Sequence, residues 1–140
     1  MRVAVTADVH LRTRGEHSER YHALENIFQQ MSAEGVENLI VAGDLFDKDF
    51  SSYTEFENLC KKYSKLRLHI IPGNHDPGIS ENSILGDNID IYTDPTPMQF
   101  DSTTFLFIPY EEKGEMGEKI AKMEKEIEGK EWILVAHGDY

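Results

Sequence analysis

The sequence has little cysteine, no long apolar run and few basic residues. Cys60 is the single cysteine among the 140 residues, so no disulfide can form within the chain. Together with the lack of a signal peptide, this favours a reducing compartment, and a cytoplasmic location is expected. The longest purely apolar runs, such as 133–136, fall far short of the roughly 18 residues that indicate a membrane span. The length suits one domain with a real core.

Negative charge dominates the composition. The chain carries 26 acidic and 14 basic side chains, for a formal net charge of -12. This excess excludes a free-standing electrostatic DNA-binding protein, because it repels phosphate backbones at long range. It does not exclude a metal-dependent enzyme that acts on phosphate esters, since carboxylates that ligate divalent cations also count as negative in this sum.

Short apolar strands alternate with amphipathic helices in the first half of the chain. The expected strands are 2–7, 38–42, 66–71 and, near the end of the chain, 132–136; the expected helices are 18–34 and 52–63. Ser18 is the expected cap of the first helix, and Gly35 is expected to end it. This order predicts an α/β fold, with a parallel sheet and helices on its faces.

The pattern loosens after Asn74. Short edge or hairpin strands are expected over 89–92, 98–100 and 104–108. A charged helix is expected over 115–128, because its apolar residues form one narrow stripe at helical spacing.

Each of the four best-defined strands ends in a cluster of residues that can bind metal ions. The clusters are Asp8-Val9-His10, Gly43-Asp44-Leu45-Phe46-Asp47, Gly73-Asn74-His75-Asp76 and His137-Gly138-Asp139. Any one of them alone would be an ordinary turn. The carboxyl ends of parallel strands meet along one sheet edge, so the clusters are expected to converge there. Their mixed oxygen and imidazole donors suit manganese, iron or zinc rather than calcium alone.

In this order, the clusters resemble the motifs of the calcineurin-like metallophosphoesterases: Asp-x-His, Gly-Asp-x-x-Asp, Gly-Asn-His-Asp and a later strand-end His. The Asp-Val-His-Leu, Gly-Asp-Leu-Phe-Asp and Pro-Gly-Asn-His-Asp groups are most similar to SbcD-type DNA double-strand-break repair nucleases. The resemblance covers residues 1–140 as the amino-terminal part of a catalytic domain. It implies a β-sandwich flanked by helices, here incomplete.

The resemblance also implies a set of metal ligands. Two divalent ions, expected to be manganese, would share Asp44 as a bridging ligand. One ion would be held by Asp8 and His10, and the other by Asn74 and His137.

Four further residues are candidates for roles other than metal binding. The resemblance implies that His75 faces the leaving group, as a proton donor or transition-state stabiliser, and that Asp47 orients it. Arg12, and with it Arg14, is a candidate for contact with substrate phosphate, although solvated loop arginines are an equally good interpretation.

One family motif is missing from the sequence. Family members continue to a Gly-His-x-His group, which supplies a further ligand to each ion, and no such group occurs up to Tyr140. The chain is therefore expected to be the front part of a longer enzyme, and by itself to bind metal weakly and to be poorly active or inactive. An alternative is a natural short form whose missing ligands come from a second chain. Without the remainder, one apolar sheet face is expected to be uncovered, which favours aggregation or association.

The expected function is that of a dimetal hydrolase, a DNA repair exonuclease or endonuclease. The expected partners are DNA and, as the SbcD-type resemblance implies, an ATPase subunit and a second copy of the chain; no membrane is expected. Two alternatives stay open: a phosphomonoesterase or small cyclic-nucleotide phosphodiesterase of the same superfamily, and a catalytically silent metal-binding protein.

Overall fold

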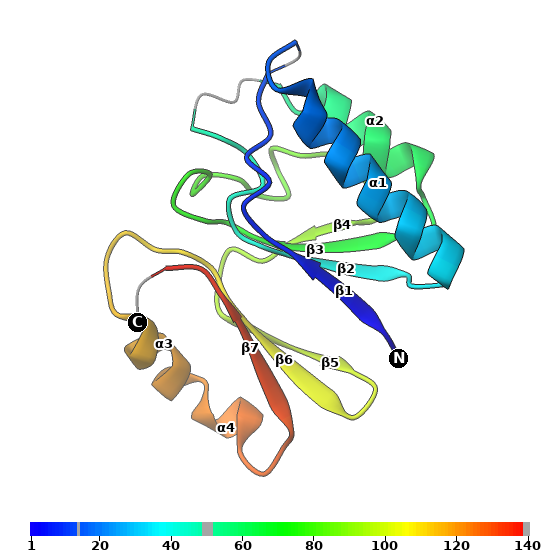
Figure 1. Cartoon of the computed structure of the whole chain (residues 1–140). Coiled ribbons are helices and arrows are strands. Elements are labelled where there is room, and N and C mark those ends of the chain that lie inside the picture. Colours follow the sequence, from blue (N-terminus) through cyan, green and yellow to red (C-terminus); the bar gives the residue numbers. More distant parts are fainter. Residues whose placement is uncertain (14, 49–51, 139–140) are drawn as a thin grey trace.

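Two β-sheets lie one on the other and carry helices on their outer faces (Figure 1). The computed structural model describes residues 1–13, 15–48 and 52–138. The first sheet contains, in spatial order, the parallel strands β1 (Val3–Thr6), β2 (Asn38–Ala42), β3 (Arg67–Ile71) and β4 (Ile89–Ile91). The second contains β5 (Thr96–Phe100), β6 (Thr103–Ile108) and β7 (Trp132–Ala136). The helices are α1 (Ser18–Glu34), α2 (Thr54–Lys62), α3 (Met116–Lys122) and α4 (Glu124–Ile127).

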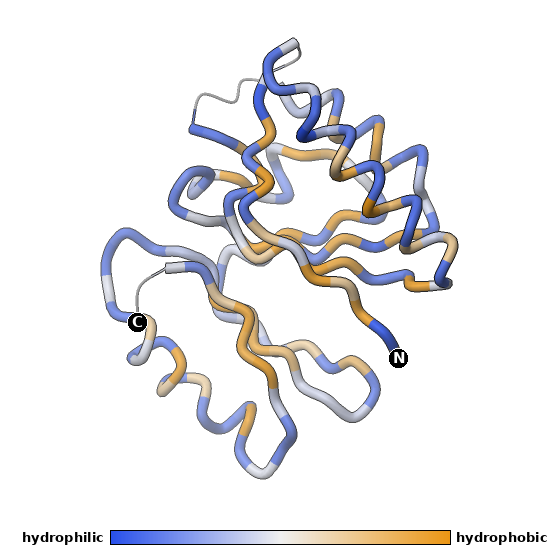
Figure 2. The backbone as a smooth tube through the Cα atoms, in the orientation of Figure 1, coloured by the Kyte–Doolittle hydropathy of each residue, from blue (hydrophilic) through white to orange (hydrophobic). Residues whose placement is uncertain are grey.

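The central strands β2 and β3 of the first sheet are buried on both faces, which explains why they are mostly apolar. Side chains alternate along β2: Leu39 and Val41 pack into the core beneath α1 and α2, whereas Ile40 packs against the second sheet. Apolar residues accordingly run along the strands of both sheets (Figure 2). Each fully buried aliphatic side chain of this kind contributes about 1.5–3 kcal/mol. The α/β sandwich flanked by helices is confirmed.

The second sheet corrects one expectation from the sequence. We expected one apolar face of the first sheet to be uncovered, but Ile40 and Ile71 are fully buried there against Phe107 and Val135 of β6 and β7. The face is covered because β5 and β6 form an antiparallel hairpin that starts a new sheet, and β7 joins it parallel to β6.

Strand β7 therefore belongs to a different sheet from β1, β2 and β3. The sequence analysis placed all four strand ends along one sheet, and this is wrong for β7. As the edge strand of the second sheet, β7 leaves Trp132, Ile133 and Leu134 partly exposed.

Two helix predictions also need correction. Helix α1 begins at Ser18, so Ser18 is not its cap; the preceding His17 has a left-handed backbone (φ 50°) and no side-chain capping hydrogen bond. The single helix expected over 115–128 is two helices, because the chain leaves helical geometry at Met123 (φ -98°, ψ 9°). Gly35 ends α1 in the left-handed conformation, as predicted.

Among the described residues, none of the helices combines the length and the hydropathy that crossing a bilayer requires.

Candidate metal centre

The loops that follow β1 and β2 are joined by backbone hydrogen bonds. The amide of Asp8 donates to the carbonyl of Gly43 (3.1 Å), and the amide of His10 donates to the carbonyl of Asp44 (3.0 Å). A further bridge links Leu11 to Phe46. The two loops thus extend the parallel pairing of their strands and bring Asp8, His10 and Asp44 to the same end of the first sheet.

Asp8, His10 and Asp44 share an unusual backbone conformation. Their φ angles are 55°, 51° and 53°, in the left-handed region that residues other than glycine rarely adopt. Such conformations cost free energy and are concentrated at functional sites, where the surrounding structure maintains them. Here the pairing between the two loops fixes the backbone and therefore the direction of the three side chains.

Two glycines allow side chains of the site to pack directly against the backbone. At Gly43, which has a φ of 87°, a Cβ atom would overlap the imidazole of His137. At Gly73, a Cβ atom would overlap the carboxylate of Asp44. Glycine is therefore required in both motifs because another side chain lies directly against its α-carbon.

Asp44 lies at the middle of the site and is 3% exposed. Its Oδ1 accepts a hydrogen bond from the backbone amide of His75 (2.8 Å). Its Oδ2 lies 3.3 Å from Nε2 of His137 and 3.7 Å from Nε2 of His10. Asp44 belongs to two groups of potential metal ligands, His10–Asp44–His75 and Asp8–Asp44–His137, and within each group the ligand atoms all lie within 4.8 Å of one another.

His137 reaches this site from the second sheet. Its Nδ1 lies 3.0 Å from the carbonyl oxygen of Ala42, which can only accept, so Nδ1 is the protonated nitrogen. In the neutral ring, Nε2 then presents a lone pair, and it lies 2.9 Å from Oδ1 of Asn74 as well as close to Asp44. Electron-pair donors that converge in this way suit a cation. The hydrogen bond on the opposite ring nitrogen is the one that metal-binding histidines usually make.

His75 lies beside His10, with the two rings edge to face and 4.7 Å between their centroids. Its Nδ1 lies 3.2 Å from Oδ1 of Asp47, so an Nδ1–H donates to that carboxylate and Nε2 is directed away from it. The structure thus brings Asp47 and His75 into the contact that the sequence analysis expected.

Asp47 is held in turn by two arginines. Oδ2 of Asp47 lies 3.1 Å from Arg12 and 3.8 Å from Arg20. Partial burial would raise the pKa of Asp47, but hydrogen bonds from the Lys48 amide, His75 and Arg12 outweigh it and keep the pKa below its usual value. Asp47 is therefore ionised at neutral pH.

The sequence analysis missed Arg20, which also donates a hydrogen bond to the carbonyl of His10 (2.6 Å). It lies on α1, away from every motif, and no sequence signal separates it from a solvated helix residue. Arg12 was a candidate for substrate contact; in this structure it binds Glu16 (3.0 Å) and Asp47.

Asp76 fastens the loop after β3 to the loop after β2. Its carboxylate accepts hydrogen bonds from the amides of Gly73 (2.7 Å) and Phe46 (3.0 Å). Burial raises the pKa of Asp76, and these hydrogen bonds oppose the shift. Asp76 therefore has a structural role that the cluster Gly73-Asn74-His75-Asp76 did not reveal by itself.

The structure brings the predicted residues together at one site. The residues that meet are Asp8, His10, Asp44, Asn74, His75 and His137. Both pairs that the resemblance implies lie side by side: Nε2 of His10 is 3.9 Å from Oδ1 of Asp8, and Nε2 of His137 is 2.9 Å from Oδ1 of Asn74. His75 also lies near His10 and Asp44, and Asp8 near His137 and Asp44. Asp44 is common to both groups, as expected of a bridging position. Arg14 and Asp139 lie outside the described residues.

The chain is an α/β protein, in which two sheets form a sandwich with helices outside. Carboxylates and imidazoles gather at its strand ends and form a candidate two-metal centre. Residues 1–140 match the family described as calcineurin-like phosphoesterase, and the chain belongs to this family. No curated protein matches the sequence.

Three solved structures are similar to this chain. The Pseudomonas putida nuclease MPE is 20% identical, with a TM-score of 0.48 over 81% of this chain. An Aquifex aeolicus protein of unknown function is 18% identical, with a TM-score of 0.47 over 89% of this chain. A Danio rerio dimetal phosphatase is 14% identical, with a TM-score of 0.45 over 88% of this chain. The chain spans 56%, 70% and 51% of their respective lengths.

Proposed function

We propose that this chain is the metal-binding, catalytic part of a dimetal phosphoesterase that hydrolyses phosphodiester bonds in DNA. The observation that supports the proposal is the position of Asp44, a buried carboxylate common to two groups of potential ligands. The SbcD-type resemblance of three motifs supports DNA as the substrate.

The proposed ligands are those that the motifs indicate: Asp8, His10, Asp44, Asn74 and His137. Bound divalent cations, expected to be manganese, would supply Lewis-acid activation of the phosphate ester and a nucleophilic water. The hydrogen bond from the His75 amide fixes the buried Asp44 carboxylate in one orientation, so Asp44 would present the same oxygen atoms to bound ions.

His75 and Asp47 are proposed to act on the leaving group. Because Nδ1 of His75 donates to Asp47, the ring is fixed in one orientation. Its Nε2 is then available to donate a hydrogen bond or a proton to the leaving oxygen. Arg12 could contact a substrate phosphate while it remains beside Asp47, since a guanidinium has five N–H donors.

The proposal names the partners that the SbcD-type resemblance implies: DNA as substrate, an ATPase subunit and a second copy of the chain. The net charge of -12 is compatible with DNA only if cations at the site offset the local carboxylates. Binding of DNA should therefore depend on metal.

Metal binding is tested first, without turnover. Thermal unfolding of the full chain is followed with increasing manganese, and the melting temperature is expected to rise as the ions bind the native state. Asp44→Ala should abolish the rise, since both groups lose a ligand. Asp87→Ala, an exposed acidic residue outside the site, is the matched control and should keep it. An undiminished rise in Asp44→Ala would place the ions elsewhere.

The activity of the complete protein is tested on two substrates side by side, end-labelled DNA and p-nitrophenyl phosphate, with manganese. The nuclease proposal is supported if the unmodified protein cleaves DNA and the Asp44→Ala variant does not. Hydrolysis of the monoester without cleavage of DNA would replace it with a phosphomonoesterase. Metal binding without either activity would favour the silent metal-binding alternative.

A further inference from the structure

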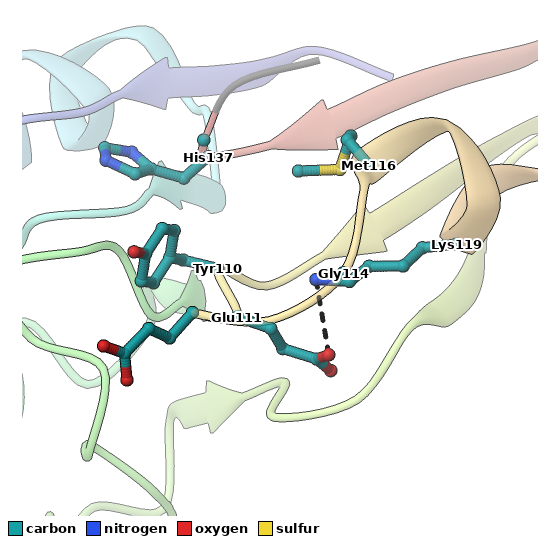
Figure 3. Close-up of a pocket in the computed structure, with 8 residues that line it drawn as sticks. Tyr110, Glu111, Gly114, Met116, Lys119 and His137 are labelled. Atoms are coloured by element: carbon teal, nitrogen blue, oxygen red, sulfur yellow. Dashed lines mark ion pairs between the residues drawn. The ribbon is translucent and has the colours of Figure 1, made fainter.

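A cavity of about 160 Å³ opens beside His137, on the side of the candidate metal centre that faces α3. Its walls include Tyr110, Glu111, Glu112, Met116 and Lys119, and we call it the Tyr110 pocket. Figure 3 shows the rings of Tyr110 and His137 next to each other, with Lys119 and Glu111 across the pocket. Since His137 belongs to both the pocket and the ligand group, a group bound in the pocket lies next to the candidate metal centre.

Two contacts fix Tyr110 relative to that centre. Its backbone amide donates a hydrogen bond to the carbonyl of Pro72 (3.0 Å), at the start of the loop that carries Asn74 and His75. Its ring lies against Gly138, where an added Cβ atom would stand 3.5 Å from Cδ2 of Tyr110. Tyr110 thus contacts two of the loops that form the candidate metal centre, one through its backbone and the other through its ring.

The charge of the pocket argues against a second phosphate. Lys119 is 9% exposed, and its amine forms an ion pair with Glu111 at 3.4 Å. This pair neutralises the ammonium and leaves the carboxylate of Glu112 as the excess charge of the lining. A pocket with one surplus carboxylate repels a phosphate and favours an uncharged group that carries N–H donors.

The other walls favour a flat ring. Tyr110 offers an aromatic face, on which nucleobases stack irrespective of sequence. Met116 adds a polarizable thioether, which makes favourable contacts with aromatic rings. A nucleobase combines the planar ring with the N–H donors, whereas a sugar offers hydroxyls but no flat apolar face.

We propose that the Tyr110 pocket binds the nucleobase of the nucleotide whose phosphate lies at the candidate metal centre, with Tyr110 as its stacking platform. This inference rests on the proposed phosphodiesterase function and assigns the chain a preference for nucleotide esters over simple phosphate esters.

The test compares two diesters with the same leaving group, the p-nitrophenyl ester of thymidine monophosphate and methyl p-nitrophenyl phosphate, on the manganese-loaded chain. Loss of one base–aromatic stack corresponds to roughly tenfold. Tyr110→Ala should therefore lower kcat/KM for the thymidine ester about tenfold more than for the methyl ester. The larger loss on the thymidine ester should come from a higher KM, not from a lower kcat. Tyr110→Phe, which keeps the ring, is the matched control and should keep the preference. Equal losses on both esters would overturn the proposal.

Binding gives a readout without turnover. Calorimetric titration should show that thymidine monophosphate binds more tightly than methyl phosphate, and that Tyr110→Ala removes most of the difference. Glu112→Gln, at an exposed residue, is a second variant that leaves the ring in place and should reduce the difference about threefold through one lost hydrogen bond. Equal affinities for the two phosphates in the unmodified chain would overturn the pocket assignment, whereas hydrolysis of neither ester would count against the proposed function alone.

Discussion

At the scale of single residues, the candidate site depends as much on the glycines as on the ligands. Gly43→Ala places a methyl group against the imidazole of His137 at a φ of 87°, so the ring must move. We expect manganese affinity to fall about tenfold, as with other changes that displace a ligand. Gly78→Ala, where an added Cβ atom meets nothing within 4 Å, is the matched control. Manganese titration of the melting temperature measures both, and equal affinities would contradict the geometry.

His75 provides the sharpest test of a single role. We predict that His75→Ala in the complete protein abolishes turnover and leaves manganese binding nearly intact, because we assign His75 to the leaving group and not to the metal. The structure makes this prediction demanding, since His75 lies in one ligand group with His10 and Asp44. Activity and equilibrium metal binding are measured on the same preparation. Loss of an ion from the variant would make His75 a ligand.

A buried histidine away from the site makes stability depend on pH. His69 is 2% exposed, lies between the sheets, and has its ring nitrogens 2.8 Å from the Tyr92 hydroxyl and 2.9 Å from Oδ1 of Asn38. Burial lowers its pKa below the usual value; Asp90 opposes the shift and Arg67 adds to it.

Because the folded pKa of His69 is lowered, its contribution to stability is complete above the unfolded pKa of about 6.5 and is lost as the pH falls towards the folded pKa. The expected slope is at most about 1.4 kcal/mol per pH unit. His69→Phe, which keeps an aromatic ring between the sheets, should lack this part of the slope. Urea unfolding of both proteins across this range, in chelator, measures the difference; parallel curves would refute it.

At the scale of elements, Asp76 connects two loops that no strand pairing joins. Asp76→Ala leaves the buried amides of Gly73 and Phe46 without this acceptor, which costs about 1–3 kcal/mol for each group. The variant also removes the free-energy cost of keeping a buried carboxylate ionised at neutral pH, and this gain offsets part of the loss. We therefore expect the free energy of unfolding to fall by about 2 kcal/mol, measured by urea unfolding.

The pH dependence of the same variant checks the cause. Because the pKa of Asp76 is raised in the folded state, the native protein holds this proton more tightly, and stability falls as the pH rises through the folded pKa. Asp76→Ala should lack this fall. An unchanged slope would mean that Asp76 is not the group responsible.

Most elements could be predicted from the sequence because their signals are local. Helical spacing together with Gly35 defined α1, and the apolar run from Asn38 to Ala42 defined β2. Which strands pair is not a local property. The 132–136 segment is equally apolar in either sheet, and only the β5–β6 hairpin decides that it joins the second.

The candidate site shows the same division. Its residues could be predicted because clusters at strand ends converge wherever the strands are parallel, even though His137 arrives from another sheet. The two groups of side chains that share Asp44 could not be predicted, since they depend on left-handed backbone angles at Asp8 and His10 that no motif specifies. Arg20 was missed because its contacts to Asp47 and His10 exist only once α1 has packed.

At the scale of the whole molecule, the net charge of -12 predicts how DNA is bound. Few basic side chains are in excess to neutralise DNA phosphates and release their counterions. The chain should therefore not retain duplex DNA in the presence of chelator, and manganese should restore binding. Gel-shift titration at low ionic strength measures this. Tight binding in chelator would show that protein cations, rather than the metal centre, carry the affinity.

The position of His137, directly after the last described strand, also fixes when the candidate site can form. During synthesis the amino-terminal part of a chain leaves the ribosome first and can begin to fold before the rest. The first sheet, with Asp8, Asp44 and Asn74, is complete 41 residues before β7 begins, since β4 ends at Ile91 and β7 starts at Trp132. A nascent chain would therefore already contain five of the six residues that meet at the candidate site, and only the arrival of β7 would add His137.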